Sequence, residues 1–214
     1  MNSTLLIFRK EWKSFLGSDP GLFVTYGFIV AIYSLVFATN SASGLGTVWW
    51  IVYAMVINSA FANTVFVAER MTGALEVLLT SGVSRRGILA GKALFAFAMS
   101  LALGGLSLAL SLVWAALMPR MGAGSTMGWE GPATFAAAAF MTTMSGAWLS
   151  VRFASPRVVH LVNIFLSMAM VGSSVALTWT PGALPAVLLG LGCVFWVLAA
   201  RAFDGERVIQ PVQL

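Results

Sequence analysis

The sequence predicts an all-α polytopic membrane protein: six transmembrane helices, an N-terminal amphipathic helix at the membrane interface and a coupling helix between spans 2 and 3. Three observations predict this class. Hydrophobic residues make up 59% of the chain and charged residues 9%, compared with about 25% charged residues in soluble domains. Six apolar runs are near the ~20 residues that a bilayer crossing requires. Nearly all basic residues fall at the ends of these runs on one side.

The first element is expected at residues 3–17, where apolar and basic side chains separate onto two helix faces. One face carries Leu5, Phe8, Trp12 and Phe15, and the other carries Arg9, Lys10 and Lys13. This pattern is typical of a helix lying in the membrane interface. The expected anchors are Phe8, Arg9, Lys10, Trp12 and Lys13. The alternative, a solvated leader, would leave the aromatic side chains in water.

The spans are expected at residues 21–39, 47–68, 88–117, 132–151, 157–178 and 182–202. Asp19-Pro20, Ser155-Pro156 and Thr180-Pro181 are typical of a helix N-cap followed by proline at the first helical position. The third run is long enough to tilt or to extend beyond the membrane. The loops are too short for a separate domain, so residues 1–214 are expected to form a single transmembrane domain.

Orientation is predicted from the distribution of Lys and Arg. With the N-terminus in the cytoplasm, eleven of the twelve basic residues are cytosolic and only Arg120 is outside. We therefore expect both termini in the cytoplasm. The same scatter along span ends argues against a nucleic-acid partner, because no basic tract is present.

Residues 69–86 form the one densely charged segment between two apolar runs. Its apolar positions have the period of a short amphipathic helix: Met71, Leu75, Leu78 and Leu79. Ser84 is a candidate N-cap for the following helix. Between two spans such a helix lies at the membrane surface, where it can receive a push from a soluble partner. The alternative is a solvated loop with a helical turn.

The chain lacks signatures of chemistry of its own. No Walker phosphate-binding loop, zinc-protease motif or nucleophile elbow is present. The only histidine, His160, is interpreted as structural, and Cys193 as a small buried hydrophobe. No catalytic, metal or cofactor site is expected. No acidic or basic residue lies deep in a run, so energy would have to come from outside the bilayer.

Polar residues within the runs have two interpretations. A possible pathway is formed by Asn58, Ser59, Asn63, Asn163 and Ser167. Ser59 and Asn63 share a helix face, as do Asn163 and Ser167. The alternative is that each makes an interhelical hydrogen bond. The spacing Gly87-x-x-x-Gly91 permits close helix contact, within one chain or between two.

The segment also resembles a known family. The order Phe66-x-x-Glu69-Arg70-x-x-Gly73-x-x-Glu76-x-Leu78-Leu79-x-Ser81-x-Val83-Ser84, followed by Ile88-x-x-Gly91-Lys92, is similar to the cytosolic segment after the second span of type 2 ABC (ATP-binding cassette) export permeases. The length and the span count resemble those permeases too.

The resemblance implies a permease subunit in the bacterial inner membrane. Its partners would be ABC ATPase subunits, which bind the ATP and Mg²⁺, and a second permease, either a copy or a paralogue. It implies a coupling role for Glu69, Arg70, Gly73, Glu76, Leu79, Ser81, Val83, Ser84 and Arg85.

Three other assignments stay open. The first is a subunit that transmits ATPase strokes to an envelope machine without moving a solute. The second is a membrane subunit similar to those of haem exporters, and the third is an autonomous channel. The connection between spans five and six is too short for the re-entrant helices of many polysaccharide and lipid exporters, which weakens a glycan assignment.

Overall fold

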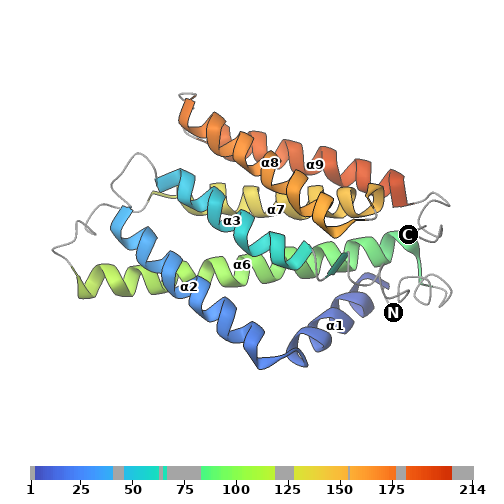
Figure 1. Ribbon diagram of the computed structural model, residues 1–214, viewed down its shortest axis with the longest axis horizontal. Helices are drawn as coiled ribbons and strands as arrows, with labels where there is room; N and C mark the ends of the chain where they lie inside the picture. Colours follow the sequence, from blue (N-terminus) through green and yellow to red (C-terminus); the bar gives the residue numbers. More distant parts are fainter. Residues whose placement is uncertain are drawn as a thin grey trace.

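The computed structural model describes residues 3–40, 46–62, 65–66, 83–118, 128–153, 155–176 and 182–203, without the side chains of 59–62 and 156. These residues form seven helices and no strand. Labelled as in Figure 1, they are α1 (Ser3–Leu16), α2 (Pro20–Asn40), α3 (Gly46–Ala62), α6 (Arg85–Leu117), α7 (Glu130–Arg152), α8 (Pro156–Ala176) and α9 (Ala183–Phe203). The predicted all-α class is confirmed for this part of the chain.

α6, α7 and α9 run in nearly the same direction, α2 lies obliquely to them, and α1 meets α2 at a sharp corner (Figure 1). α6 packs against α1 and α2, whereas α7 packs most extensively against α9 and α3. The start of α6 and the ends of α3, α7 and α9 lie at the same end of the bundle as the start of α1 (Figure 1). Helices that alternate in direction along the bundle produce this arrangement.

The predicted helix starts are confirmed where the structure describes them. Asp19 accepts a hydrogen bond from the Gly21 amide at 2.9 Å, and α2 begins at Pro20. Ser84 is the N-cap of α6, and its hydroxyl accepts from the Gly87 amide at 3.2 Å. α8 begins at Pro156. These caps satisfy amides that have no partner inside their own helix. Thr180-Pro181 lies outside the described residues.

Four helices are long and apolar enough to cross a membrane: α2, α6, α8 and α9. α3 has 17 residues, about 25 Å of helix, and its apolar part is shorter still. α7 has 23 residues but is rich in alanine, threonine and serine. The chain therefore has the helices of a membrane protein, and the six-span arrangement stays a prediction.

The composition of α7 has a physical reason. Fourteen of its 23 residues are buried, compared with five of 21 in α2. A helix surrounded by other helices does not need large apolar side chains, because it does not face lipid. Its small residues allow close packing: Ala137, Ala139 and Ala147 are fully buried. Hydropathy is thus a weaker signal for this helix than for α2, α8 or α9.

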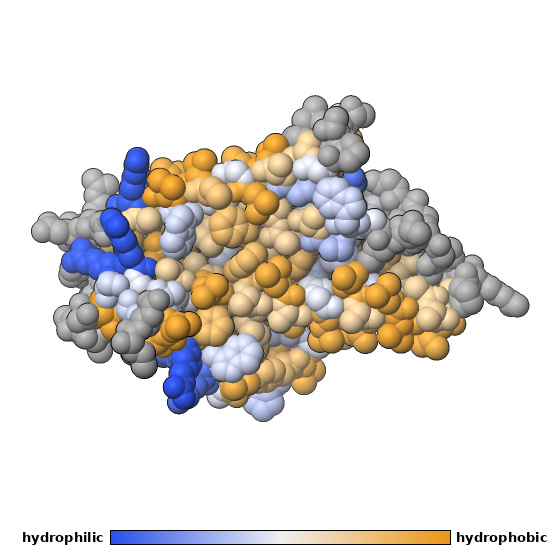
Figure 2. Space-filling model, turned by 180° about the vertical axis from the view of Figure 1, so that it is seen from behind, coloured by the Kyte–Doolittle hydropathy of each residue, from blue (hydrophilic) through white to orange (hydrophobic). Residues whose placement is uncertain are grey.

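Basic residues gather at one end of the bundle, which we call the basic end. It carries Arg85, Arg86, Lys92, Arg152, Arg157 and Arg201 on the bundle helices, and Arg9, Lys10 and Lys13 on the neighbouring α1. Figure 2 shows most strongly hydrophilic side chains toward this end and apolar ones along the middle of the molecule. An apolar belt with one basic end is typical of a protein inserted in a membrane.

Candidate functional site

A buried polar contact lies at the basic end, where α1 rests on the first turns of α6. Glycine permits this close approach. A Cβ atom at Gly91 would lie 2.7 Å from the Thr4 carbonyl oxygen and 2.7 Å from the Ile7 Cβ. One at Gly87 would lie 2.2 Å from the Ser3 hydroxyl. The Gly87-x-x-x-Gly91 spacing therefore serves a contact within the chain, which settles one alternative left open by the sequence.

Lys92 joins three helical segments at this contact. Its Nζ donates to Glu11 Oε1 of α1 at 3.1 Å and to the Val65 carbonyl, just past α3, at 2.7 Å. The side chains of Lys92 and Glu11 are 3% and 9% exposed. Charges this buried are stable only when paired and hydrogen-bonded. The pair therefore fixes where α1 lies relative to α6 and the chain after α3.

Aromatic rings pack beside this ion pair. Phe95 of α6 lies with its ring centroid 6.0 Å from that of Phe8 and 6.2 Å from that of Phe15, both in edge-to-face geometry. Phe95 is 2% exposed. Such pairs add about 0.5–1.5 kcal/mol to the burial of their area. Ion pair and rings together define the node, by which we mean Glu11, Lys92, Val65, Phe15 and Phe95.

Contacts with the node at one end and with α1 at the other frame the predicted coupling segment. Val65 and Phe66 lie in a π-helical turn directly before it, and both are buried. At the other end, the Ser84 hydroxyl lies 3.0 Å from that of Ser3 in α1. Val83 packs against the core. The segment thus leaves and re-enters the bundle beside the same helix, α1.

Most predicted coupling residues, and the helix expected there, lie outside the described residues: Glu69, Arg70, Gly73, Glu76, Leu79 and Ser81. Of the remaining three, Val83 is half-buried, whereas Ser84 and Arg85 are exposed. Ser84 performs the capping role predicted for it. The coupling role of all nine stays a prediction.

A helix is present at the predicted place, as α1, but its buried face is rotated from the expected apolar face, and its location in the membrane interface stays a prediction. Leu5 and Trp12 are 59% and 42% exposed, whereas Phe8 and Phe15 pack on Phe95. The buried face is centred on Ile7 and Glu11. Arg9 and Lys13 are exposed, and Lys10 Nζ lies 3.5 Å from Glu11 Oε1. Two of the four aromatic and aliphatic positions therefore face the bundle.

The sequence does not mark Glu11 as a site residue, and it indicates no partner for Lys92. The sequence features that point to their contact are weak. α1 contains one acidic residue, Glu11, and three basic residues. Lys92 follows the Gly87-x-x-x-Gly91 spacing that marks a close helix contact. No sequence rule connects residues 81 positions apart.

The possible pathway residues that the structure describes make hydrogen bonds in the interior. Asn58 Oδ1 accepts from the hydroxyls of Ser100 and Thr143, both at 2.8 Å, which links α3, α6 and α7. Asn163 Oδ1 accepts from the Ser145 hydroxyl at 2.7 Å. The Ser167 hydroxyl donates to the Asn163 carbonyl. The side chains of Ser59 and Asn63 lie outside the described residues.

Asn58 and Asn163 therefore make the interhelical hydrogen bonds that the sequence offered as the alternative to a pathway role. Asn58 is 1% exposed and Asn163 5% exposed. Within the described part of the chain, no group of three or more His, Cys, Asp or Glu side chains comes together to hold a metal. Cys193 is exposed on α9, so the expectation that it is buried is wrong.

Fold and site together define a helical membrane protein whose one buried ion pair among the described residues ties an amphipathic N-terminal helix to the bundle. Comparison with known protein families, with curated proteins and with solved structures finds no match to this chain.

Proposed function

We propose that this chain is the permease subunit of an ATP-binding cassette transporter, of the export type, driven by a separate ATPase. The observation that carries the proposal is the framing of segment 67–82. Lys92 binds the carbonyl of Val65 before the segment, and α1 contacts Ser84 after it. A displacement of that segment therefore acts on α3, α6 and α1 together.

The polar interior supports an external energy source. Lys92 is buried in α6, and it binds Glu11 and Val65. No other acidic or basic side chain is buried in a described helix of the bundle. Ion-coupled transporters use intramembrane ionisable groups that exchange partners during the cycle. A single buried pair at one end of the bundle suits a mechanical joint better than an ion pathway.

The proposal places the basic end in the cytoplasm of a bacterial cell, with both termini there and the chain in the inner membrane. Positively charged residues favour that side. ATP and Mg²⁺ are then bound by the partner ATPases, and a second permease, identical or paralogous, completes the transporter. Residues 69–86 dock on the ATPase, and α1 lies in the surrounding lipid interface.

The stroke is proposed to pass through three contacts. Movement of the docked segment pulls on the turn at Val65 and Phe66 and on the cap at Ser84. Lys92 transmits the first movement to α1 and α6, because one ammonium group binds both Glu11 and Val65. Packed helices with few voids shift as rigid bodies.

One observation favours a second candidate, a subunit that transmits force without moving a solute. Asn58 and Asn163 bond to neighbouring helices in this chain. A solute path would then have to run between two chains, along exposed faces. A continuous polar cavity between two copies supports the exporter, and a dry contact between them supports force transmission.

The test uses the chain purified together with its ATPase. Gly73→Pro breaks the expected helix of the docking segment, because proline removes a backbone donor and clashes with the preceding turn. We expect loss of permease-stimulated ATP hydrolysis with normal membrane insertion. Gly128→Pro, the matched change at the opposite end of the bundle, should leave stimulation intact. Equal stimulation of ATP hydrolysis by the two variants would contradict the proposed docking role.

A further inference from the structure

A small pocket lies in the corner between α1, α2 and the start of α6. Its volume is about 90 Å³, which accommodates several waters, since each needs roughly 10–15 Å³. The lining residues are Glu11, Ser14, Phe15, Ser18, Leu22, Tyr26, Val65 and Phe95. We propose that this pocket binds the ammonium headgroup of an ethanolamine phospholipid.

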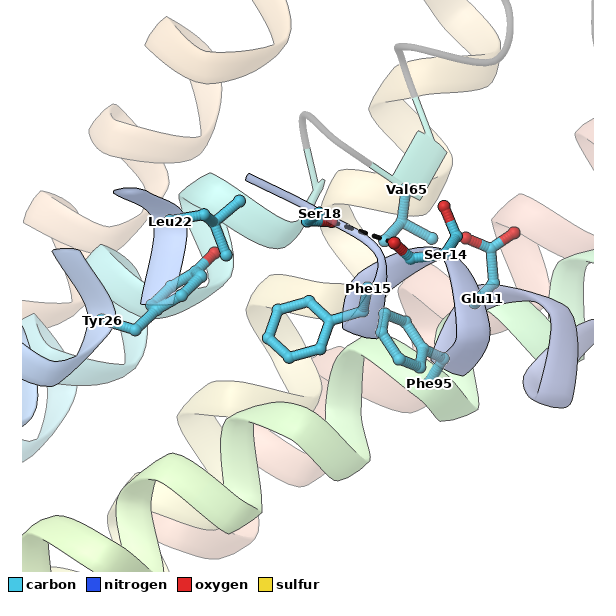
Figure 3. A pocket seen from close by; sticks show the side chains of 8 residues that line it. All are labelled: Glu11, Ser14, Phe15, Ser18, Leu22, Tyr26, Val65 and Phe95. Carbon is cyan, nitrogen blue, oxygen red and sulfur yellow. Dashed lines mark hydrogen bonds between the residues drawn. The ribbon is translucent and has the colours of Figure 1, made fainter. Parts of the chain in front are cut away.

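The lining is divided into a polar and an aromatic side. Figure 3 shows Glu11 and Ser14 on α1 and Ser18 just past its end, with the Phe15 and Phe95 rings next to them and Tyr26 approaching from α2. Phe15 lies 6.3 Å from Tyr26 and 6.2 Å from Phe95 between ring centroids. A carboxylate and several aromatic rings lining one pocket form a combination that attracts an organic ammonium ion.

Glu11 has an oxygen available for this ligand. The contacts of Lys92 and Lys10 both fall on Oε1, which leaves Oε2 without a protein hydrogen-bond partner in the described part of the chain. The Ser18 hydroxyl donates to the Ser14 carbonyl at 3.0 Å, so its oxygen lone pairs remain able to accept. These acceptors suit a primary ammonium group, which donates three hydrogen bonds, whereas a trimethylammonium group donates none.

The position of the pocket points to a lipid as the source of the ammonium group. It lies where the amphipathic helix α1 turns into the first span, α2. Leu5, Trp12 and Leu16 of α1 are exposed, which places this helix at headgroup depth in a membrane. Lys10 Nζ, 3.5 Å from Glu11 Oε1, is close enough to attract the phosphate of a zwitterionic headgroup.

The experiment is native mass spectrometry of the full chain, purified in detergent without any ATPase. The chain is given equal amounts of ethanolamine, choline and glycerol phospholipids with the same acyl chains. We expect preferential retention of the ethanolamine lipid. Ser14→Met fills the pocket and should abolish the preference. Phe15→Leu removes one ring and should weaken retention about two- to fivefold.

Glu11 is kept intact in these variants, because its replacement would also break the ion pair with Lys92. Trp12→Leu is the matched control: it removes an aromatic ring from the same helix outside the pocket. It should keep the headgroup preference. Thermal unfolding of each variant checks that the bundle is intact.

Three results would overturn the proposal. The first is equal retention of the three lipids by the natural chain. The second is an equal loss of preference in Trp12→Leu and Phe15→Leu, since that would indicate general membrane affinity. The third concerns the source of the ammonium group. Displacement of the lipid by millimolar free ethanolamine would assign the pocket to soluble amines instead, which also contradicts the lipid assignment. The measurement does not depend on an ATPase partner, so its outcome is separate from that of the proposed function.

Discussion

The contributions of Glu11 and Lys92 to the free energy of unfolding should be coupled, because the two side chains form one buried ion pair. Glu11→Ala removes the carboxylate that neutralises a lysine whose side chain is 3% exposed. Breaking a buried pair from one side costs about 3–5 kcal/mol. Because Lys92 also binds the Val65 carbonyl, we expect a value near the lower limit, about 3 kcal/mol.

Lys92→Met keeps the length of the side chain and removes its charge. The Val65 carbonyl then loses a donor, which costs about 1–3 kcal/mol for a buried acceptor. Glu11 retains Lys10 at 3.5 Å, so its charge is partly compensated. The double variant has neither buried charge, and such replacements are often close to neutral. Its cost should fall below the sum of the single costs by about 2 kcal/mol.

The assay is a double-mutant cycle on unfolding in mixed detergent micelles. Lys13→Met is the control, because Lys13 is exposed on the same helix; its effect should stay within about 0.5 kcal/mol. Additive costs for Glu11→Ala and Lys92→Met, within about 0.5 kcal/mol, would refute the reasoning. The two residues would then not act together.

Three further predictions concern packing, topology and interior polarity. Gly91→Ala should destabilise the bundle by about 1–3 kcal/mol, because its Cβ meets the α1 backbone, whereas Gly105→Ala, with open space around it, should be neutral or slightly stabilising in the same unfolding assay. With the single native cysteine replaced by serine, Ser84→Cys should be labelled by an impermeant reagent only from the cytoplasmic side and Trp129→Cys only from the outside; the reverse pattern would overturn the orientation. Asn58→Leu should cost about 0.6–2 kcal/mol in stability and leave transport intact; loss of transport in a stable variant would indicate a pathway role.

Local features of this fold could be predicted from the sequence. Asp19 and Ser84 cap helices because a side-chain oxygen reaches an amide two or three residues away, and that geometry depends only on the neighbouring chain. The helices α2, α6, α8 and α9 could be predicted from their apolar runs, because such a run is also a local property of the sequence. The bounds of α2 and α9 agree with the predicted runs to within one residue.

The tertiary contacts could not be predicted from the sequence. Which face of α1 contacts the bundle depends on where Gly87 and Gly91 lie in space, and the periodicity of α1 favoured Phe8 and Trp12 equally. The surroundings of Asn58 come from Ser100 and Thr143, which lie on two other helices. Lys92 and Glu11 meet only after α1 folds back onto α6.

The central claim is that the segment between α3 and α6 receives work from a nucleotide-hydrolysing partner and passes it into the bundle. Site-specific photo-crosslinking of the purified complex tests it most directly, with the photoreactive residue at Leu79 or at Trp129. The account predicts an adduct with the ATPase from Leu79 and none from Trp129. An ATPase adduct from Trp129, with none from Leu79, would contradict it.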